Sequence, residues 1–537
     1  MFGGAAANWP GGADPLVTSS WRQRSVSGAT GLFGGVLAAL AVPPFGYWPL
    51  AIAGTALLYA AVRSASPRRR LLAGFAFGLG FFGIGYAWVA NLVAGGWIAL
   101  TVFEAGLTAL ACLAIRGAGP SLRSWRPTGF ATTMVLADAF RWWWPFGGMP
   151  IGSVALGQAA APLGQLGRVG GPLLVEGATF VLGACLGELL AGTRERPLRF
   201  PTGVLVILTT TAGLIALSYG APDGGTPAGH LRVALVQGGG VRGLHALFTD
   251  ASIVYQRQLK PTLSLPDRPR PDLVVWPEDV IALDRPLAGS PEAGQVGDAA
   301  RRLHTTLVAG VTETVGSMAF RNEAVAWAPD GSIIATYEKV HRVPFGEYIP
   351  FRSFFSHFGP TGLVPRDAIP GHRPGILVTP AGQLGVMISF EVFYPGPAAA
   401  AVSRGATVLV VPTNDASYST GQVPAQEVAA DRLRAIEEGR NLVQAAPTGY
   451  TDVVDNRGRL IGRTSLGTAA VLERSVALHT GRTWYSVLGD WPMIGLALGL
   501  LIAYWSLTLS RPSCPRPMEV PEHADPDNAR PEEARLP

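Results

Sequence analysis

Three residues that could act as a base, a cation and a nucleophile each follow a short apolar run. Glu278 ends the run DLVVWPE, Lys339 follows ATYE, and Ser389 comes directly after GVMI. Each alone has an ordinary explanation, because polar residues at strand ends often cap helices, form turns or face water. Together they provide what nucleophilic catalysis requires: a proton acceptor, an attacking hydroxyl and an ammonium that stabilises negative charge.

Four more polar residues stand at comparable places. Glu347 lies in the segment HRVPFGEYIP, Glu391 ends GVMISFE, and Asn414 and Asp415 end ATVLVVPTND. Sites in α/β sheets form where the carboxyl ends of strands meet. We therefore expect these side chains to gather at one site with the three above.

The elements that must position these residues are short, apolar and rich in β-branched residues. The runs cover residues 231–237, 272–278, 306–313, 385–391 and 406–415. The stretch 322–339 carries Pro-Asp-Gly at its centre and predicts a hairpin, and AQEVAADRLRAIEEGRNLV (425–443) has a helical pattern. Buried strands that alternate with helices predict a layered α/β domain over residues 221–485.

The rest of the chain is strongly apolar. It has 537 residues, of which 48% are hydrophobic and only 15% charged, against about 25% charged in an ordinary soluble protein. Long apolar stretches of the kind that span a bilayer lie at 28–46, 49–65, 71–93, 96–115, 128–147, 168–192, 201–220 and 486–510. The sequence therefore predicts a membrane bundle of seven spans over residues 28–220 and a last span at 486–510.

Arginine in the loops predicts the orientation. Arginines precede the first span and follow the second, fourth and sixth, whereas the alternate loops FGYWP and NLVAGG carry none. Because positive loops stay on the cytoplasmic side, the N-terminal segment 1–27 is expected there and the α/β domain outside. The Pro-rich, charged tail 511–537 is expected to be disordered and cytoplasmic.

Composition excludes several kinds of site and leaves two other classes open. The three cysteines and eight histidines are scattered without metal-ligand spacing, so we expect no metal and no cofactor. Nucleic-acid binding is not expected, since topology already explains the positive loops. A transporter would use intramembrane carboxylates such as Glu104, Glu176 and Glu188, but it gives no reason for the α/β domain. A soluble C–N hydrolase would not need eight spans.

The motifs resemble a known family. WPE, EKVHRVPFGEYIP, a strand ending in FE, and TND follow one another as in the nitrilase superfamily, whose members use a Glu–Lys–Cys triad. The apolar spans, with QLGRVGGPLLVEG and RLRAIEEGRNLVQAAPTG, narrow the resemblance to the apolipoprotein N-acyltransferases, bacterial membrane enzymes that complete lipoproteins. The resemblance covers nearly the whole chain.

The resemblance implies a fold, a reaction and roles for the residues. The outer domain would be an αββα sandwich on the extracytoplasmic face of the bacterial cell membrane. The reaction would move an acyl chain from a phospholipid to the enzyme and then to the α-amine of a diacylglyceryl-apolipoprotein. Glu278 matches the general base, Lys339 the oxyanion-stabilising lysine and Ser389 the nucleophile's position. The supporting positions are Glu347, Phe390, Glu391, Asn414 and Asp415.

Three departures from the family pattern leave two interpretations open. Ser389 replaces the nucleophilic cysteine, Ser417 stands where a tryptophan is expected, and another tryptophan after VQGGG is absent, where Phe248 is the nearest aromatic residue. A hydroxyl is far less acidic than a thiol and depends more on its base. The chain is therefore either an acyltransferase with a slower serine nucleophile or an impaired relative that binds lipoproteins or stabilises a partner.

Overall fold

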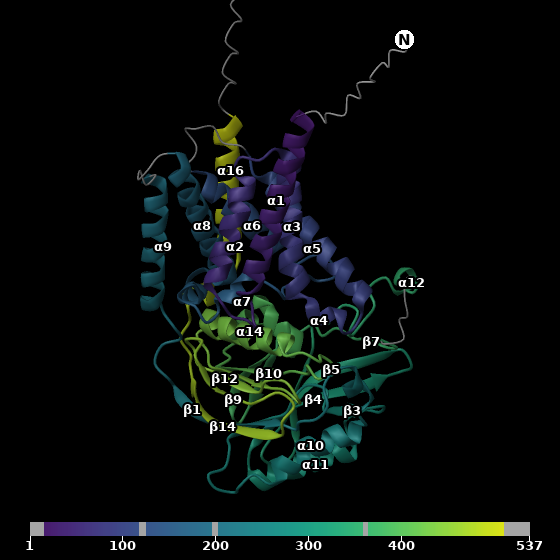
Figure 1. The fold of residues 1–537 in the computed structure, drawn as a ribbon. Helices are drawn as coiled ribbons and strands as arrows, with labels where there is room; N and C mark the ends of the chain where they lie inside the picture. Colours follow the sequence, from purple (N-terminus) through teal and green to yellow (C-terminus); the bar gives the residue numbers. More distant parts are fainter. Residues whose placement is uncertain (1–14, 117–124, 196–201, 358–363, 510–537) are drawn as a thin grey trace, which may run out of the picture.

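The computed structural model describes residues 15–116, 125–195, 202–357 and 364–509. Most of the predicted N-terminal segment and all of the predicted tail 511–537 lie outside these residues or have no described side chains. Within them, a helical bundle is joined to one α/β unit, and the bundle helices run roughly parallel above the sheets in Figure 1.

Eight helices of the described bundle overlap the predicted apolar stretches. They are α1 (Pro15–Ala39), α2 (Pro49–Val62), α3 (Pro67–Gly85), α5 (Ala94–Ala114), α6 (Arg126–Arg141), α8 (Gly167–Glu195), α9 (Thr202–Gly220) and α16 (Trp491–Leu509). Three helical segments of the described chain are long and apolar enough to cross a membrane, namely Ala94–Ala114, Pro162–Leu190 and Trp491–Thr508. Short helices α4 (Ala87–Ala90), α7 (Val154–Gln158) and η2 (Pro162–Leu166) face the α/β unit.

Small residues let the bundle helices approach closely, as is usual between helices in lipid. A Cβ at Gly35 would lie 2.0 Å from the carbonyl oxygen of Phe77. The motif GRVGGP bends α8, because Gly171 has a φ of 67° and Pro172 follows it inside the helix. A Cβ on Gly171 would lie 2.2 Å from the ring of Tyr485, so this bend requires glycine.

The α/β unit contains two sheets. The first has the order β14-β1-β2-β4-β5-β6, with β3 beside β4 and β7 beside β5. Its strands are β1 (Gly229–Gln237), β2 (Leu273–Val275), β3 (Ile281–Leu283), β4 (Thr306–Val315), β5 (Ala319–Trp327), β6 (Ile333–Glu338), β7 (Asp367–Ala368) and β14 (Ala470–Leu478). The second has the order β13-β12-β11-β10-β9-β8. Its strands are β8 (Ile376–Thr379), β9 (Gly382–Val386), β10 (Val408–Pro412), β11 (Leu442–Ala445), β12 (Asp452–Val454) and β13 (Leu460–Arg463).

The layers confirm the predicted αββα sandwich. Apolar side chains from both sheets, such as Val275 and Val410, form one core between them. Helices α10 (Ala251–Leu263) and α11 (Pro291–Leu303) cover the outer face of the first sheet. Helices α13 (Pro395–Ser403) and α14 (Gln422–Glu438) cover the second. The predicted hairpin is also confirmed, since β5 and β6 pair antiparallel around Pro-Asp-Gly.

One predicted element is partly wrong. The helical pattern 425–443 ends early, because α14 stops at Glu438 and Leu442–Ala445 form strand β11. Gly439 ends the helix with a φ of 61°. A Cβ there would lie 2.7 Å from the backbone nitrogen of Gly224, so the chain turns sharply at this glycine.

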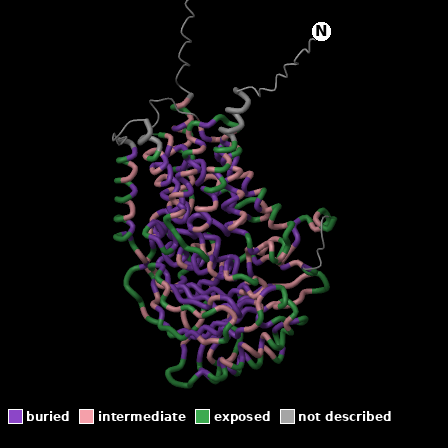
Figure 2. The backbone as a smooth tube through the Cα atoms, viewed as in Figure 1, coloured by how far each residue is buried: buried purple, intermediate pink, exposed green. Residues whose placement is uncertain are grey.

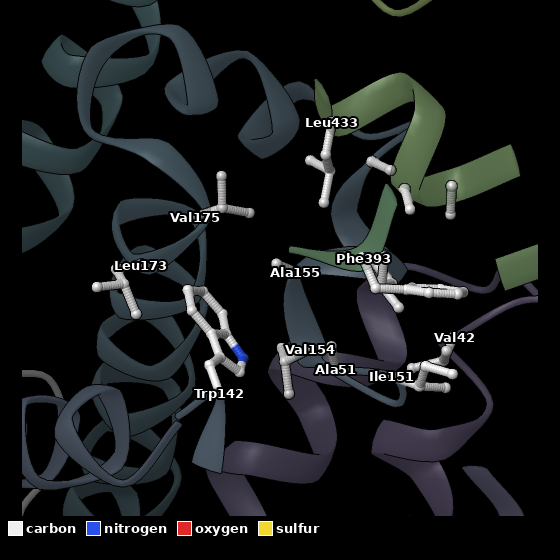
Figure 3. Close-up of a cluster of buried hydrophobic side chains, with 14 of the residues drawn as sticks. Val42, Ala51, Trp142, Ile151, Val154, Ala155, Leu173, Val175, Phe393 and Leu433 are labelled. Carbon is white, nitrogen blue, oxygen red and sulfur yellow. The ribbon is translucent and has the colours of Figure 1, made fainter. Parts of the chain in front are cut away.

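Helix α14 lies between the second sheet and the bundle (Figure 1). Buried side chains of the α/β unit, Phe393 and Leu433, belong to the same apolar cluster as Trp142, Ile151 and Val154 of the bundle (Figure 3). Burial is continuous from the bundle interior into the sheets (Figure 2). The two parts therefore share one core, and the bundle directly supports the loops that follow the strands.

Candidate active site

The ends of strands from both sheets meet at one place. Glu278 follows β2 of the first sheet, and its backbone N–H lies 3.3 Å from the carbonyl oxygen of Thr413, which follows β10 of the second. Gly310 on the neighbouring strand β4 makes room for this crossing, because a Cβ there would lie 2.3 Å from the Cα of Glu278. This contact joins two of the predicted site segments.

Lys339 lies between two glutamates. Its Nζ is 2.8 Å from Oε1 of Glu278 and 2.8 Å from Oε1 of Glu347. The amide nitrogen of Asn322 also donates to both atoms, at 2.7 Å and 3.0 Å. Lys339 is only 1% exposed, so the site holds a buried ammonium with two carboxylates, as expected for Glu278, Lys339 and Glu347.

Glu278 keeps one carboxylate oxygen without a hydrogen bond from the described part of the chain. Its Oε1 accepts hydrogen bonds from Asn322 and Lys339, but its Oε2 accepts no hydrogen bond from any described residue. Burial raises the pKa of Glu278 above its usual value, the Lys339 ammonium opposes this, and the nearby Glu347 adds to it. For Lys339, burial lowers the pKa, but the two carboxylates outweigh that effect and hold it above its usual value. The lysine therefore stays charged beside a carboxylate with one free oxygen.

Glu391 joins the lysine segment to the nucleophile segment. Its carboxylate accepts backbone N–H bonds from Val340 and His341 at 2.8 and 3.0 Å and from Ile388 at 2.8 Å. The Tyr337 hydroxyl lies 2.9 Å from both carboxylate oxygens. Burial would raise the pKa of Glu391, but the His341 side chain, the backbone N–H groups of Ile388 and His341 and the Lys339 ammonium together lower it below its usual value. Glu391 is thus a buried anion that holds the residues next to Lys339 and Ser389 together.

Ser389 sits at a sharp turn where β9 gives way to the 3₁₀ helix η5 (Ser389–Phe393). Its φ is 48°, in the left-handed region that residues with side chains rarely adopt. Such strain persists mainly at functional sites. The residue is 9% exposed, and its hydroxyl makes no hydrogen bond within the described chain. Phe390 turns away into an aromatic cluster, with its ring 5.3 Å from that of Tyr394.

The other two predicted residues lie further out. Asn414 accepts a hydrogen bond from Ala416 N at 3.2 Å, which is a local turn contact. Asp415 is fully buried, and its Oδ1 is 3.6 Å from a guanidinium nitrogen of Arg242. Burial raises the pKa of Asp415 to about 6, Arg242 opposes this and Glu278 adds to it. Neither side chain contacts Lys339 or Ser389 directly.

The aromatic positions depart from the expected pattern here too. Phe248 is 81% exposed, and its ring stacks on no other ring of the described chain. Ser417 is half-buried. The neighbouring Tyr418 meets the ring of Trp88 edge-on at 5.0 Å, so an aromatic contact with the bundle lies beside the small serine.

Three contributors escaped the sequence analysis: Asn322, Tyr337 and Arg242. Asn322 could have been found, since the hairpin register places it opposite Lys339. Tyr337 lies two residues before Lys339, on the same face of β6. Arg242 binds carbonyl oxygens in the loops after two different strands, Tyr418 after β10 and Thr448 after β11, which no local pattern reveals. Among the described residues, no group of three or more His, Cys, Asp or Glu side chains is arranged to hold a metal ion.

Comparison with known proteins finds relatives for both parts of the chain. Residues 34–185 match the apolipoprotein N-acyltransferase N-terminal domain, and residues 232–486 match the carbon-nitrogen hydrolase domain. The chain is 30% identical over 505 residues to the apolipoprotein N-acyltransferase of Azotobacter vinelandii, covering 89% of this chain and 94% of that protein. It is 31% identical over 480 residues to that of Mycolicibacterium smegmatis, covering 84% and 80%.

Saccharomyces cerevisiae Nit3, a member of branch 10 of the nitrilase superfamily, matches with a TM-score of 0.37 and 20% identity, covering 47% of this chain and 91% of that one. The match to the Azotobacter enzyme spans nearly the full length of both proteins, and the two matching domains together account for both the bundle and the sandwich. The chain belongs to the apolipoprotein N-acyltransferase family.

Proposed function

We propose that this protein transfers a fatty acyl chain from a membrane phospholipid to the N-terminal diacylglyceryl-cysteine of apolipoproteins, through an acyl-enzyme on Ser389. The observation that carries the proposal is the buried Lys339, bound to Glu278 and Glu347 at 2.8 Å each, in a member of this family. Glu391 attaches this group to the strained turn that carries Ser389.

The reaction follows from these positions. Glu278 accepts the proton of the Ser389 hydroxyl as its Oγ attacks the ester carbonyl of the phospholipid, and the Lys339 ammonium stabilises the oxyanion. The lysophospholipid leaves as an alcohol and takes the proton from Glu278. The α-amine of the lipoprotein then attacks the serine ester, an amide forms, and Ser389 regains a proton.

The remaining predicted residues have supporting roles in this proposal. Glu347 helps fix the Lys339 ammonium, and Glu391 fixes the backbone on both sides of the site. Phe390 provides part of an apolar wall. Asn414 and Asp415 shape the loop after β10.

We further propose eight membrane spans, with the α/β domain (221–485) outside the bacterial cytoplasm, where both lipid substrates would be met. Large apolar side chains on the outside of the bundle support this, since Val206 is 56% and Ile502 62% exposed. Lipid would cover such side chains. A reporter fused after Ala221 should score outside the cytoplasm, and one fused after Arg516 inside. The reverse result would overturn this topology.

One observation favours a second candidate function. The Ser389 hydroxyl has no hydrogen-bond partner in the described chain, so no base is yet engaged with it. A chain that keeps the fold and has lost the chemistry would bind lipoproteins or stabilise a partner. In that case Ser389→Ala would leave its biological role intact.

Complementation of a bacterial strain that lacks its apolipoprotein N-acyltransferase tests the proposal. The natural chain should restore growth, Ser389→Ala should not, and Ser389→Cys should restore it at least as well. Purified protein given phospholipid should gain the mass of an acyl chain on the peptide that contains Ser389. Growth restored by Ser389→Ala would exclude the serine as nucleophile.

A further inference from the structure

A buried ionic cluster lies inside the bundle, apart from the active site. Arg141, at the end of α6, is 2% exposed in its side chain, and its Nε is 3.0 Å from Oε2 of Glu104. The same guanidinium lies 3.5 Å from Asp138, donates to the hydroxyl of Tyr86 and covers the ring of Phe82 at 4.8 Å. Charges buried so deeply in a bundle call for a reason, because burying them is costly.

This cluster holds the loop 142–153, which leads from α6 towards the α/β unit. The carbonyl oxygen of Ile151 accepts hydrogen bonds from Arg141 at 2.9 Å and from the Tyr86 hydroxyl at 3.0 Å. The backbone carbonyl of Arg141 accepts a further bond from Met149 N at 2.8 Å. The C-terminal part of the loop is thus bound to the arginine that directly precedes the loop.

The loop in turn binds the segments that carry the active-site residues. The hydroxyl of Tyr394 donates to the carbonyl of Gly148 at 2.9 Å, and that of Tyr348 donates to Phe146 at 3.1 Å. Tyr348 directly follows Glu347, which contacts Lys339.

Tyr394 also continues the nucleophile segment. It ends η5, which begins at the nucleophile position, and its ring stacks on His341 with centroids 4.6 Å apart. Phe393 belongs to the same buried cluster as Trp142 and Ile151 (Figure 3). The loop 142–153 therefore touches both segments that converge on the site.

We propose that Arg141 is a positioning residue for the nucleophile. The ion pairs of Arg141 fix the loop 142–153, and the loop fixes Tyr394 and Tyr348. These two tyrosines hold Ser389 and Glu347 in position relative to Lys339. A site of this kind depends on supporting contacts that lock its geometry. A role of Arg141 in acyl transfer rests on the proposed function. The positioning itself does not, because it can be measured without a lipid substrate.

The test measures the reactivity of a thiol at position 389 in the full-length protein in detergent. In the Ser389→Cys variant, the rate of alkylation by iodoacetamide is followed on that peptide by mass spectrometry across a pH series. Tyr394→Phe and Arg141→Gln are each added to it. Arg70→Gln is the matched control, because Arg70 is 6% exposed and also binds a backbone carbonyl, that of Val62 at 3.1 Å, but lies at the start of α3, away from the sandwich.

Each added change should slow alkylation near neutral pH by about twofold to tenfold, the effect of one hydrogen bond of ordinary strength. The pH profile should shift upward, since the thiol loses its alignment with the base and the cation. The two changes combined should slow it no more than the stronger one alone, because they act through one loop. Arg70→Gln should leave the rate unchanged.

Several results would overturn the proposal. A structure that is only loosened would admit iodoacetamide faster, so an increase in the alkylation rate contradicts the proposal. An equal loss of rate in Arg70→Gln also contradicts it. So does a double variant whose loss is the product of the two single losses, because the two residues would then act independently. Tyr394→Phe removes only one hydroxyl, so it decides the matter if Arg141→Gln does not fold. If no variant transfers acyl chains yet alkylation follows the expected pattern, the proposed function fails and the positioning role stands.

Discussion

Replacing Lys339 with methionine tests the electrostatic core of the site. The change removes an ammonium that lies 2.8 Å from two buried carboxylates and leaves Glu278 and Glu347 facing each other with Asn322 as their shared donor. Breaking a buried ion pair by removing one partner costs about 3–5 kcal/mol. For a unit of this size that corresponds to a loss in Tm on the order of 10 °C.

A second substitution separates stability from chemistry. Adding Glu347→Gln to Lys339→Met removes one of the two unpaired charges, so more than half of the lost Tm should return. Acyl transfer should not return, because no ammonium is left to stabilise the oxyanion. Lys260→Met is the control for removal of a lysine, since Lys260 is exposed on α10. Thermal unfolding in detergent, followed by tryptophan fluorescence, measures all four proteins.

The pH dependence of the loss in Tm caused by Lys339→Met gives a further check. Burial already raises the pKa of Glu278, and loss of the opposing ammonium should raise it more. A carboxyl whose pKa is raised by folding stabilises the folded state at low pH and loses that contribution as pH rises through the raised value. The Lys339→Met deficit should therefore be larger at about pH 8 than at about pH 5. A small deficit that is equal at both pH values, or activity in the double variant, would refute the reasoning.

Three other changes have expected outcomes. Glu391→Gln keeps the side-chain size but replaces one acceptor oxygen with an amide group that faces backbone N–H donors. The rate of acyl transfer should fall on the order of a hundredfold. An unchanged rate would exclude the role of Glu391 in holding the two backbone segments together. Gly310→Ala puts a Cβ 2.3 Å from the Cα of Glu278, so the backbone must shift and both activity and Tm should fall; thermal unfolding measures the second, and an unchanged Tm would contradict the close crossing at Gly310. Burial raises the pKa of Glu437 to about 8, so its stabilisation is lost as pH rises towards that value. Glu437→Gln should flatten the fall in Tm between about pH 6 and pH 9, and an unchanged slope would contradict this.

The sequence predicts the elements whose patterns are strong and local. The apolar runs and the Pro-Asp-Gly turn give the central strands and the hairpin, because buried strands are continuously apolar. Strand β14 (Ala470–Leu478) escapes, since it carries Glu473, Arg474 and Ser475 on exposed positions at the edge of the sheet. The predicted helical pattern 425–443 runs into strand β11 (Leu442–Ala445) because Leu442 and Val443 continue the apolar spacing of α14. Only the contact of Gly439 with Gly224 shows why the helix must end.

For the site too, the positions at strand ends are predictable from the sequence and the loop contacts are not. Glu278 and Lys339 follow β2 and β6 of the first sheet and Ser389 follows β9 of the second, so the strand pattern places each of them near a strand end. The contact of Glu347 with Lys339 depends on a loop that folds back through Val343 N, 2.8 Å from the other oxygen of Glu347. No periodic pattern describes such a loop. The support from Arg141 is further removed, because it reaches the sandwich only through the loop 142–153 and the hydroxyl of Tyr394.

A serine requires more of its base than a cysteine does, because a hydroxyl gives up its proton only as it attacks. Glu278 suits this need. Burial and the nearby Glu347 raise its pKa, and Lys339 and Asn322 bind one carboxylate oxygen and leave the other free. The arrangement that favours a thiolate thus also favours attack by a hydroxyl. The two nucleophiles then differ mainly in the second step, because an oxygen ester is a poorer acyl donor to an amine than a thioester. Ser389→Cys should therefore speed transfer of the acyl chain from the enzyme to the amine and not acylation of the enzyme.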